Sequence, residues 1–192
     1  MTNPQIIPSH GGYANLLSYR KAEVIYDATV KFCARFFRKY DRTTDQMVQA
    51  VRSGKQNIVE GSMVSGTSKE GELKLTGVAR ASLEELLTDY RDFLRTRNMH
   101  LWEKDSKESL EIRNLGKSKD FAYENIQKYV EAGPAEVAAN VIICLIRQAN
   151  YLLNRQLQAL EKYFLEHGGL RERMTKARID ARNQKKNSDN TK

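Results

Sequence analysis

The sequence predicts an all-α protein, more specifically an antiparallel up-down-up-down four-helix bundle with a helical insertion and a basic C-terminal helical tail. Three observations lead to this prediction. Four long stretches place apolar residues three or four positions apart, as amphipathic helices do. The 192 residues include only three prolines and eleven glycines, which permits long uninterrupted helices. No stretch shows the period of two that is typical of a strand.

The first expected helix runs from about residue 17 to residue 40. It follows an arm, residues 1–12, in which two prolines and two glycines discourage regular structure. Apolar side chains at Val24, Ala28 and Phe32 mark one line of its face. The end of this helix is basic, and cations there either complement the helix dipole or bind an anion. The residues in question are Arg35, Arg38, Lys39 and Arg42.

The second expected helix spans about residues 45–62, with Thr43 or Thr44 as its N-cap. It carries a stripe of small residues, although a glycine inside a helix costs about 1 kcal/mol relative to alanine. We therefore interpret the stripe as a packing seam against a neighbouring helix. Its members are Ala50, Ser53, Gly54, Asn57 and Gly61.

Thr67 or Ser68 caps a third helix that continues to about residue 97, and residues 135–167 form the fourth. Between these two, the polar stretch 98–134 is expected to be an insertion with short helical pieces near 104–113 and 119–130. Gly168 and Gly169 stop the fourth helix. The expected domains are the arm, the bundle at 13–168 and a tail at 169–192, in which a short helix ends near residue 183 and the last nine residues are disordered.

The positive charge of the chain is concentrated in the tail. The whole chain carries a formal charge of +8, and residues 169–192 hold eight Lys or Arg against three Asp or Glu. The tail alone therefore accounts for +5. Such a segment suits a polyanion, such as nucleic acid or an acidic protein surface, but it is equally typical of a solvated tail that only keeps the protein soluble.

The sequence offers no recognisable catalytic centre, metal site or cofactor site. His10, His100 and His167 are far apart, and neither Cys33 nor Cys144 belongs to a CxxC pair. Phosphate-binding loops and nucleophile elbows are missing. We expect no enzyme activity and two buried, free thiols in a reducing compartment. The N-terminus does not resemble a signal peptide, and no apolar run approaches a membrane span, so a cytoplasmic location is expected.

Polar residues on the second and third helices lie close to inward positions. Such residues form either a buried network that fixes the register of the helices or a binding or catalytic constellation. The network reading requires that every member is hydrogen-bonded. The residues concerned are Arg52, Ser53, Asn57 and Glu60, with Ser82 and Glu85 as their partners.

The segments QMVQAVRSGKQNIVEG (46–61) and SKEGELKLTGVARASLEELL (68–87) resemble the bacterial 23S rRNA intervening-sequence proteins. In that family one helix ends in a pattern like R-x-x-x-S-I-x-x-N-I-x-E-G, which Asn57, Ile58, Glu60 and Gly61 match. The next helix carries a pattern like A-R-G-S-x-x-E-L. Ala79, Arg80, Ser82, Glu85 and Leu86 match it, whereas Ala81 replaces the glycine and Gly54 lies near the usual Ser-Ile. The stretch 98–134 and the tail look like the family variant with an added suffix domain.

The resemblance implies an up-down-up-down bundle that assembles as a ring of five subunits. Related bundles accompany reverse transcriptases in diversity-generating retroelements, where they bind nucleic acid and the polymerase. The family brings no catalytic residues with it.

Two functions therefore remain open. One is a non-catalytic, oligomeric accessory protein that binds RNA or DNA without sequence specificity and partners a reverse transcriptase. The other is a protein–protein scaffold or adaptor with no nucleic-acid role. Aromatic residues do not interleave with the basic ones, so base-specific readout is not expected. The candidate phosphate-binding residues are Arg35, Arg38, Lys39, Arg42, Lys55, Lys69, Lys74, Arg171, Arg173, Lys176, Arg178 and Arg182.

Overall fold

The computed structural model describes residues 10–118 and 120–189, with side chains described up to residue 183. These residues are helical and contain no strand, which confirms the all-α class. The α-helices are α1 (Leu17–Phe36), α2 (Arg42–Val64), α3 (Lys69–Thr96), α4 (Lys107–Leu115), α5 (Ala135–His167) and α6 (Leu170–Asp189). Two 3-10 turns, η1 (Tyr13–Asn15) and η2 (Tyr123–Asn125), and a π-helical turn, η3 (Lys128–Ala132), complete the structure.

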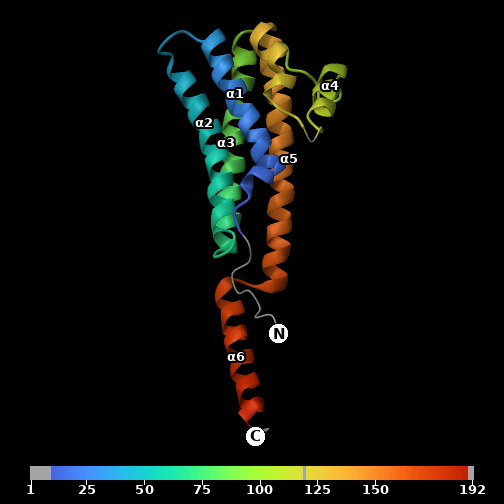
Figure 1. The fold of residues 1–192 in the computed structure, drawn as a ribbon. Helices are drawn as coiled ribbons and strands as arrows, with labels where there is room; N and C mark the ends of the chain where they lie inside the picture. The colour runs from blue at the N-terminus through green and yellow to red at the C-terminus, as the bar shows by residue number, and fades with distance from the viewer. Residues whose placement is uncertain (1–9, 119, 190–192) are drawn as a thin grey trace.

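The long helices α1, α2, α3 and α5 lie side by side, and α4 and α6 sit outside them (Figure 1). Helix α1 packs against α2 and α5, and α3 packs against the same two helices from the other side. Helix α4 rests on α5, and α6 continues beyond the end of α5, away from the other helices. Of the predicted arm at residues 1–12, only the last three residues lie within the described part, where the Gly11 amide donates to the Ser62 carbonyl over 3.1 Å.

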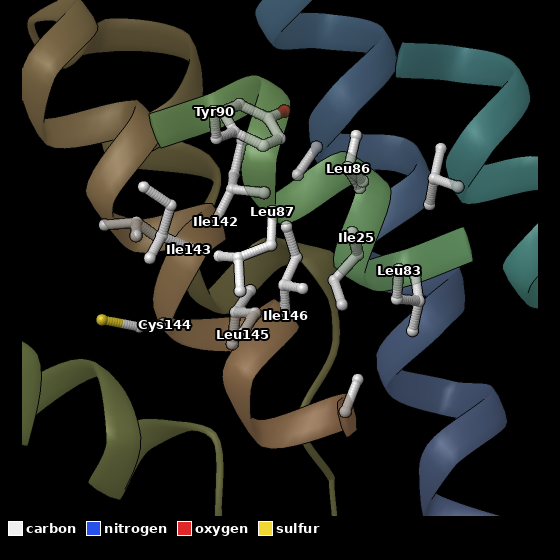
Figure 2. Close-up of a cluster of buried hydrophobic side chains, with 14 of the residues drawn as sticks. Ile25, Leu83, Leu86, Leu87, Tyr90, Ile142, Ile143, Cys144, Leu145 and Ile146 are labelled. Atoms are coloured by element: carbon white, nitrogen blue, oxygen red, sulfur yellow. The ribbon is translucent and has the colours of Figure 1, made fainter. Parts of the chain in front are cut away.

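The core is centred on the first half of α5. Nine consecutive residues, 138–146, are buried, so every face of this part of the helix is covered. The covering elements are α1, α3, α4 and η3. Figure 2 shows Ile142, Leu145 and Ile146 pointing toward Ile25 of α1 and Leu87 of α3, whereas Cys144 points away from this cluster. The Cys144 thiol instead donates to the Ser109 hydroxyl of α4 over 3.7 Å.

The stripe of small residues on α2 is a packing seam, as predicted. A Cβ atom at Gly54 would lie 3.0 Å from two carbons of the Leu83 side chain, and one at Gly61 would lie 3.4 Å from the Cβ of Leu75. Both neighbours belong to α3. The missing side chains therefore allow α2 and α3 to approach closely, which offsets the intrinsic cost of glycine in a helix.

The boundaries of α1 and α2 differ from the sequence-based expectation. Helix α1 ends at Phe36 instead of near residue 40, because the extended backbone of Phe37 turns its ring toward Phe93, with the ring centroids 5.4 Å apart. The predicted caps Thr43 and Thr44 are wrong. Asp41 is the N-cap of α2, and its carboxylate accepts from the Thr43 amide. Ser68 caps α3, as one of the two alternatives predicted.

The segment after α3 is fixed to α5 by the buried amide of Asn140 and by the Glu136 carboxylate, which accepts from the His100 amide over 3.0 Å. The side-chain nitrogen of Asn140 donates to the carbonyls of His100 (2.8 Å) and Glu136 (2.9 Å), and its oxygen accepts from the Trp102 amide (2.8 Å). The helical piece expected near 104–113 is α4, which begins and ends two to three residues later, whereas the piece expected at 119–130 is replaced by the short turns η2 and η3. Helix α6 also differs, since it continues to Asp189, beyond the expected end near residue 183. Residues 190–192 lie outside the described residues.

Candidate nucleic-acid interface

The twelve predicted phosphate-binding residues fall in three separate places. The first is the turn between α1 and α2, the second is the α2–α3 pair, and the third is α6. In Figure 1 the α1–α2 turn lies at one end of the molecule and α6 extends from the other. The folded chain therefore does not bring the predicted residues onto a single surface.

At the α1–α2 turn, all four predicted cations are exposed, but only three of them are without a side-chain hydrogen bond within the described residues. Arg38, Lys39 and Arg42 make no ion pair within the described residues, although Lys39 lies over the Tyr40 ring. Arg35 is different, because its guanidinium donates to the carbonyls of Val130 and of Gly133, the latter over 3.1 Å. Arg35 therefore ties α1 to the end of η3.

Arg97, which the sequence analysis did not single out, adds a further cation to this end of the molecule. Its guanidinium lies 4.0 Å from the centroid of the Phe93 ring, and the ring of Phe37 is 5.5 Å away. Only the break of α1 at Phe36 places Phe37 under Arg97, so the helical pattern alone gave no signal for this contact.

The cations predicted on α2 and α3 are dispersed, and two of the three are already engaged. The Lys69 ammonium pairs with the Glu72 carboxylate at 2.7 Å, and its side chain is only 16% exposed. Lys55 is half-buried, and its ammonium lies 4.4 Å from the centroid of the Tyr26 ring. Lys74 is exposed on α3. This group has no common surface on which a phosphate backbone would lie.

Helix α6 presents three arginines on one face. Arg171, Arg178 and Arg182 are separated by seven and four residues, a spacing that brings them to the same side of a helix. All three are exposed, and none makes an ion pair or a side-chain hydrogen bond within the described residues. Lys176 is exposed as well, whereas Arg173 is half-buried.

The predicted polar network exists in a reduced form. The hydroxyls of Ser53 and Ser82 lie 3.0 Å apart and join α2 to α3, and the Asn57 amide donates to the Ser53 carbonyl over 2.8 Å. The other three predicted members, Arg52, Glu60 and Glu85, are exposed and take no part in these hydrogen bonds. Their side chains leave the α2–α3 seam toward solvent, so the network consists of three residues and not six.

The two cysteine thiols lie in surroundings that disfavour their reactive form. Burial raises the pKa of the Cys33 thiol to about 12 and also raises the pKa of the Cys144 thiol, which keeps both sulfurs protonated and poorly nucleophilic. Both cysteines are free, as predicted. No group of three His, Cys, Asp or Glu side chains that might hold a metal ion occurs in the part of the chain that the structure describes.

No helix among the described residues has the length and apolar character that crossing a membrane requires. Comparison of the chain with protein-family models, with curated proteins and with solved structures gives no match. The family resemblance of the α2–α3 segment therefore rests on its sequence motifs alone.

Proposed function

We propose that this chain is a cytoplasmic, non-catalytic accessory protein that binds RNA or DNA without sequence specificity, and that α6 makes the main phosphate contacts. The observation that carries this proposal is the exposed face of Arg171, Arg178 and Arg182, which have no ion-pair partner among the described residues. Guanidinium groups without intramolecular partners are free to form the charge-assisted hydrogen bonds that phosphates accept. The exposed cations of the α1–α2 turn, Arg38, Lys39 and Arg42, supply a second and smaller set.

The proposal includes assembly. The resemblance of residues 46–87 to the ring-forming family supports an antiparallel up-down-up-down bundle that associates as a homopentamer. A ring of five chains would carry a formal charge of about +40 and would present five copies of α6. Several weak phosphate-binding elements on one particle then act together, because the second and later contacts are intramolecular. A reverse transcriptase would be the protein partner in that setting.

A scaffold role is the second candidate, and one observation favours it. Large apolar side chains are exposed at the end of α5 and along the first half of α6, where Leu165 is 78% exposed and Ile179 is 51% exposed. Phe164 and Met174 are also exposed there. Apolar side chains gathered on a surface are typical of a protein-binding face. This surface either closes the ring or receives a partner protein.

The test of the main proposal compares two triple variants with the same loss of charge. In the first, Arg171, Arg178 and Arg182 are changed to Gln. In the second, the exposed and dispersed cations Lys31, Arg91 and Lys107 are changed to Gln. Binding to a labelled single-stranded RNA is measured by fluorescence anisotropy between about 50 and 200 mM salt, the range in which phosphate contacts lose most affinity.

We expect the α6 variant to bind more weakly and to reduce the slope of log affinity against log salt by about 2, since each lost phosphate contact contributes about 0.7 on single strands. The dispersed variant should retain most of the affinity of the wild type. Equal losses in the two variants would remove the special role of α6. Binding that does not depend on salt would overturn the electrostatic mechanism and leave the scaffold as the function to pursue.

A further inference from the structure

A cavity of about 790 Å³ lies between α1, α4 and α5, away from α6 and from the α1–α2 turn. Its walls come from the start of α1, the end of α4 with the residues that follow it, and the middle of α5. This volume is within the range of pockets that enclose small organic ligands. The cavity is therefore a candidate site that is independent of the proposed nucleic-acid interface.

The charge of this cavity has a single sign. Six of its lining residues are cationic, and none of the described residues that line it is Asp or Glu. Arg113 is partly neutralised by Asp105, with 3.5 Å between the charged atoms, but Arg147 is half-buried and has no hydrogen-bond or ion-pair partner within the described residues. The six residues are Arg20, Lys21, Lys104, Arg113, Lys117 and Arg147.

Lys21 is the most informative of these residues, because only 7% of it is exposed. Its ammonium donates to the Gly116 carbonyl and lies 3.9 Å from the centroid of the Phe121 ring. These contacts leave further N–H donors on the ammonium, and no carboxylate among the described residues pairs with it. A buried ammonium without a counter-ion is costly, and an anion in the cavity would remove that cost.

Gln148 adds a second unsatisfied group in the same place. Its amide nitrogen donates to the Arg113 carbonyl over 2.8 Å, whereas its buried amide oxygen accepts from no donor in the described part of the chain. Both Lys21 and Gln148 converge on Gly116, where a Cβ atom would lie only 2.7 Å from the Lys21 ammonium. The absence of a side chain at Gly116 thus makes room for two polar groups that a bound molecule can engage.

The rest of the wall is apolar. Leu17, Phe121, Tyr151 and Leu152 line the cavity and offer a surface for an acyl chain or an aromatic ring. Leu17 and Tyr151 are exposed, at 53% and 61%, and as lining residues they add apolar surface that a bound molecule would cover. The wall therefore combines a cationic part with an apolar part, and a purely inorganic anion would leave the apolar part unused.

We propose that this cavity binds a small amphipathic anion, with a carboxylate, sulfonate or phosphate head against Lys21 and Arg147 and an acyl or aryl body against Phe121 and Leu152. The head supplies the counter-ion that the buried ammonium lacks. The body displaces water from the apolar wall, which is the main source of affinity for such ligands. The proposal does not require nucleic-acid binding.

The test uses two fluorescent probes that differ only in the presence of an anionic sulfonate group. The probe 1-anilinonaphthalene-8-sulfonate is an aryl sulfonate, and N-phenyl-1-naphthylamine is the same ring system without the anion. Titration of the folded protein with each probe gives a dissociation constant and a stoichiometry, and competition with myristate and with phenyl phosphate distinguishes carboxylate from phosphate heads.

Two variants test the site, each with a matched control. Lys21→Met keeps the apolar stem and removes the charge, and Lys74→Met does the same at an exposed position on α3. Arg147→Gln removes a guanidinium that makes no hydrogen bond or ion pair within the described residues, so the fold should be unaffected. Arg91→Gln is its exposed control. Thermal unfolding of each variant shows whether the fold is intact.

We expect one sulfonate per chain, binding of the neutral probe at least about tenfold weaker, and a loss of about tenfold or more in Lys21→Met, as for one charge-assisted hydrogen bond. Arg147→Gln should weaken binding several-fold, and both controls should bind like the wild type. The proposal is overturned if the neutral probe binds as tightly as the sulfonate, or if Arg147→Gln and a folded Lys21→Met bind the sulfonate as the wild type does.

Discussion

The two halves of α5 belong to one continuous helix, but the first half is buried and most of the second half is exposed to solvent or half-buried. In the first half, residues 138–146 are buried without interruption, and α1, α3, α4 and η3 cover the helix on all sides. In the second half, residues 151–167, only Leu153 and Leu160 are buried. The helix then gives way to α6, which has no buried residue among those described.

This difference separates stability from function along the chain. Burial of apolar surface is the dominant favourable contribution to folding, so the first half of α5 with its neighbours holds the fold together. The second half and α6 contribute few such contacts, and their charged and apolar side chains face outward. Residues there are free to bind another molecule without weakening the core, which is the arrangement that the proposed function requires.

The largest expected effect tests the core half of α5. Ile142→Ala deletes a side chain that is fully buried between α1 and α3, and we expect a loss of about 2–5 kcal/mol in the free energy of unfolding. Leu165→Ala in the other half removes a side chain that is 78% exposed, and it should change the free energy by less than about 0.5 kcal/mol. Urea denaturation followed by circular dichroism measures both. Similar losses in the two variants would show that the outer half is buried in the assembled protein.

The next largest expected change in the free energy of unfolding distinguishes two glycines, Gly54 of α2 and Gly77 of α3. A Cβ atom at Gly54 would meet Leu83 at 3.0 Å, whereas nothing lies within 4 Å of a Cβ atom at Gly77. Gly54→Val should therefore lower the free energy of unfolding by about 1–3 kcal/mol through overpacking. Gly77→Ala should raise it by about 0.5–1 kcal/mol, because alanine favours the helix. Stabilisation by Gly54→Val would disprove the close α2–α3 seam.

A pH effect of similar or smaller size is expected from Lys21. Burial lowers the pKa of its ammonium from 10.5 to about 8, and the charged groups that face it across the cavity are Arg20, Arg113, Lys117 and Arg147. Between about pH 8 and 10.5 the unfolded chain holds a proton that the folded chain has lost, so stability rises with pH by at most about 1.4 kcal/mol per unit.

This rise is measured as the difference between the wild type and Lys21→Met in urea denaturation at pH 7, 8 and 9, because other groups titrate equally in both. The wild type should gain stability relative to the variant as the pH increases through 8. A constant difference across this range would mean that the Lys21 ammonium is well solvated, or is already paired with an anion.

The smallest expected effect lies in α6. Changing Arg171, Arg178 and Arg182 to Gln removes no intramolecular contact within the described residues, so the free energy of unfolding should change by less than about 0.5 kcal/mol. Differential scanning calorimetry of the variant and the wild type provides the measurement. A clear drop in the melting temperature would show that these arginines pack against the protein itself, which would contradict their proposed availability for phosphate.

Much of the fold could be predicted, because the spacing of apolar residues in a sequence indicates which face of a helix is buried. The bounds of α3 and α5 follow from their apolar spacing and from Ser68 and Gly168, and the glycines of α2 indicated the seam. The short elements were harder. Asn140 fixes residues 98–102 to α5 through two hydrogen bonds, and a single asparagine in an apolar helix carries no sign of partners about forty residues away.

The candidate sites were predicted unevenly for the same reason. The cations of α6 could be identified because they are close together in sequence. The cavity could not, since its cations come from α1, α4, the loop after α4, and α5, and only the packing of α4 on α5 brings them together. Arg52, Glu60 and Glu85 were assigned to the polar network because helical spacing alone does not determine how far toward solvent a long side chain extends.

The measurement that tests the central claim most directly is the light-scattering mass of the protein with and without a short RNA–DNA heteroduplex, at low and at high salt. We predict a mass of five chains that increases with the heteroduplex at low salt and loses that increase at high salt, because phosphate contacts weaken as counterions compete. The variant in which Arg171, Arg178 and Arg182 are changed to Gln should keep the mass of five chains, and the heteroduplex should increase that mass only slightly at low salt. A particle whose mass is indifferent to the heteroduplex at every salt concentration would contradict nucleic-acid binding and favour the scaffold.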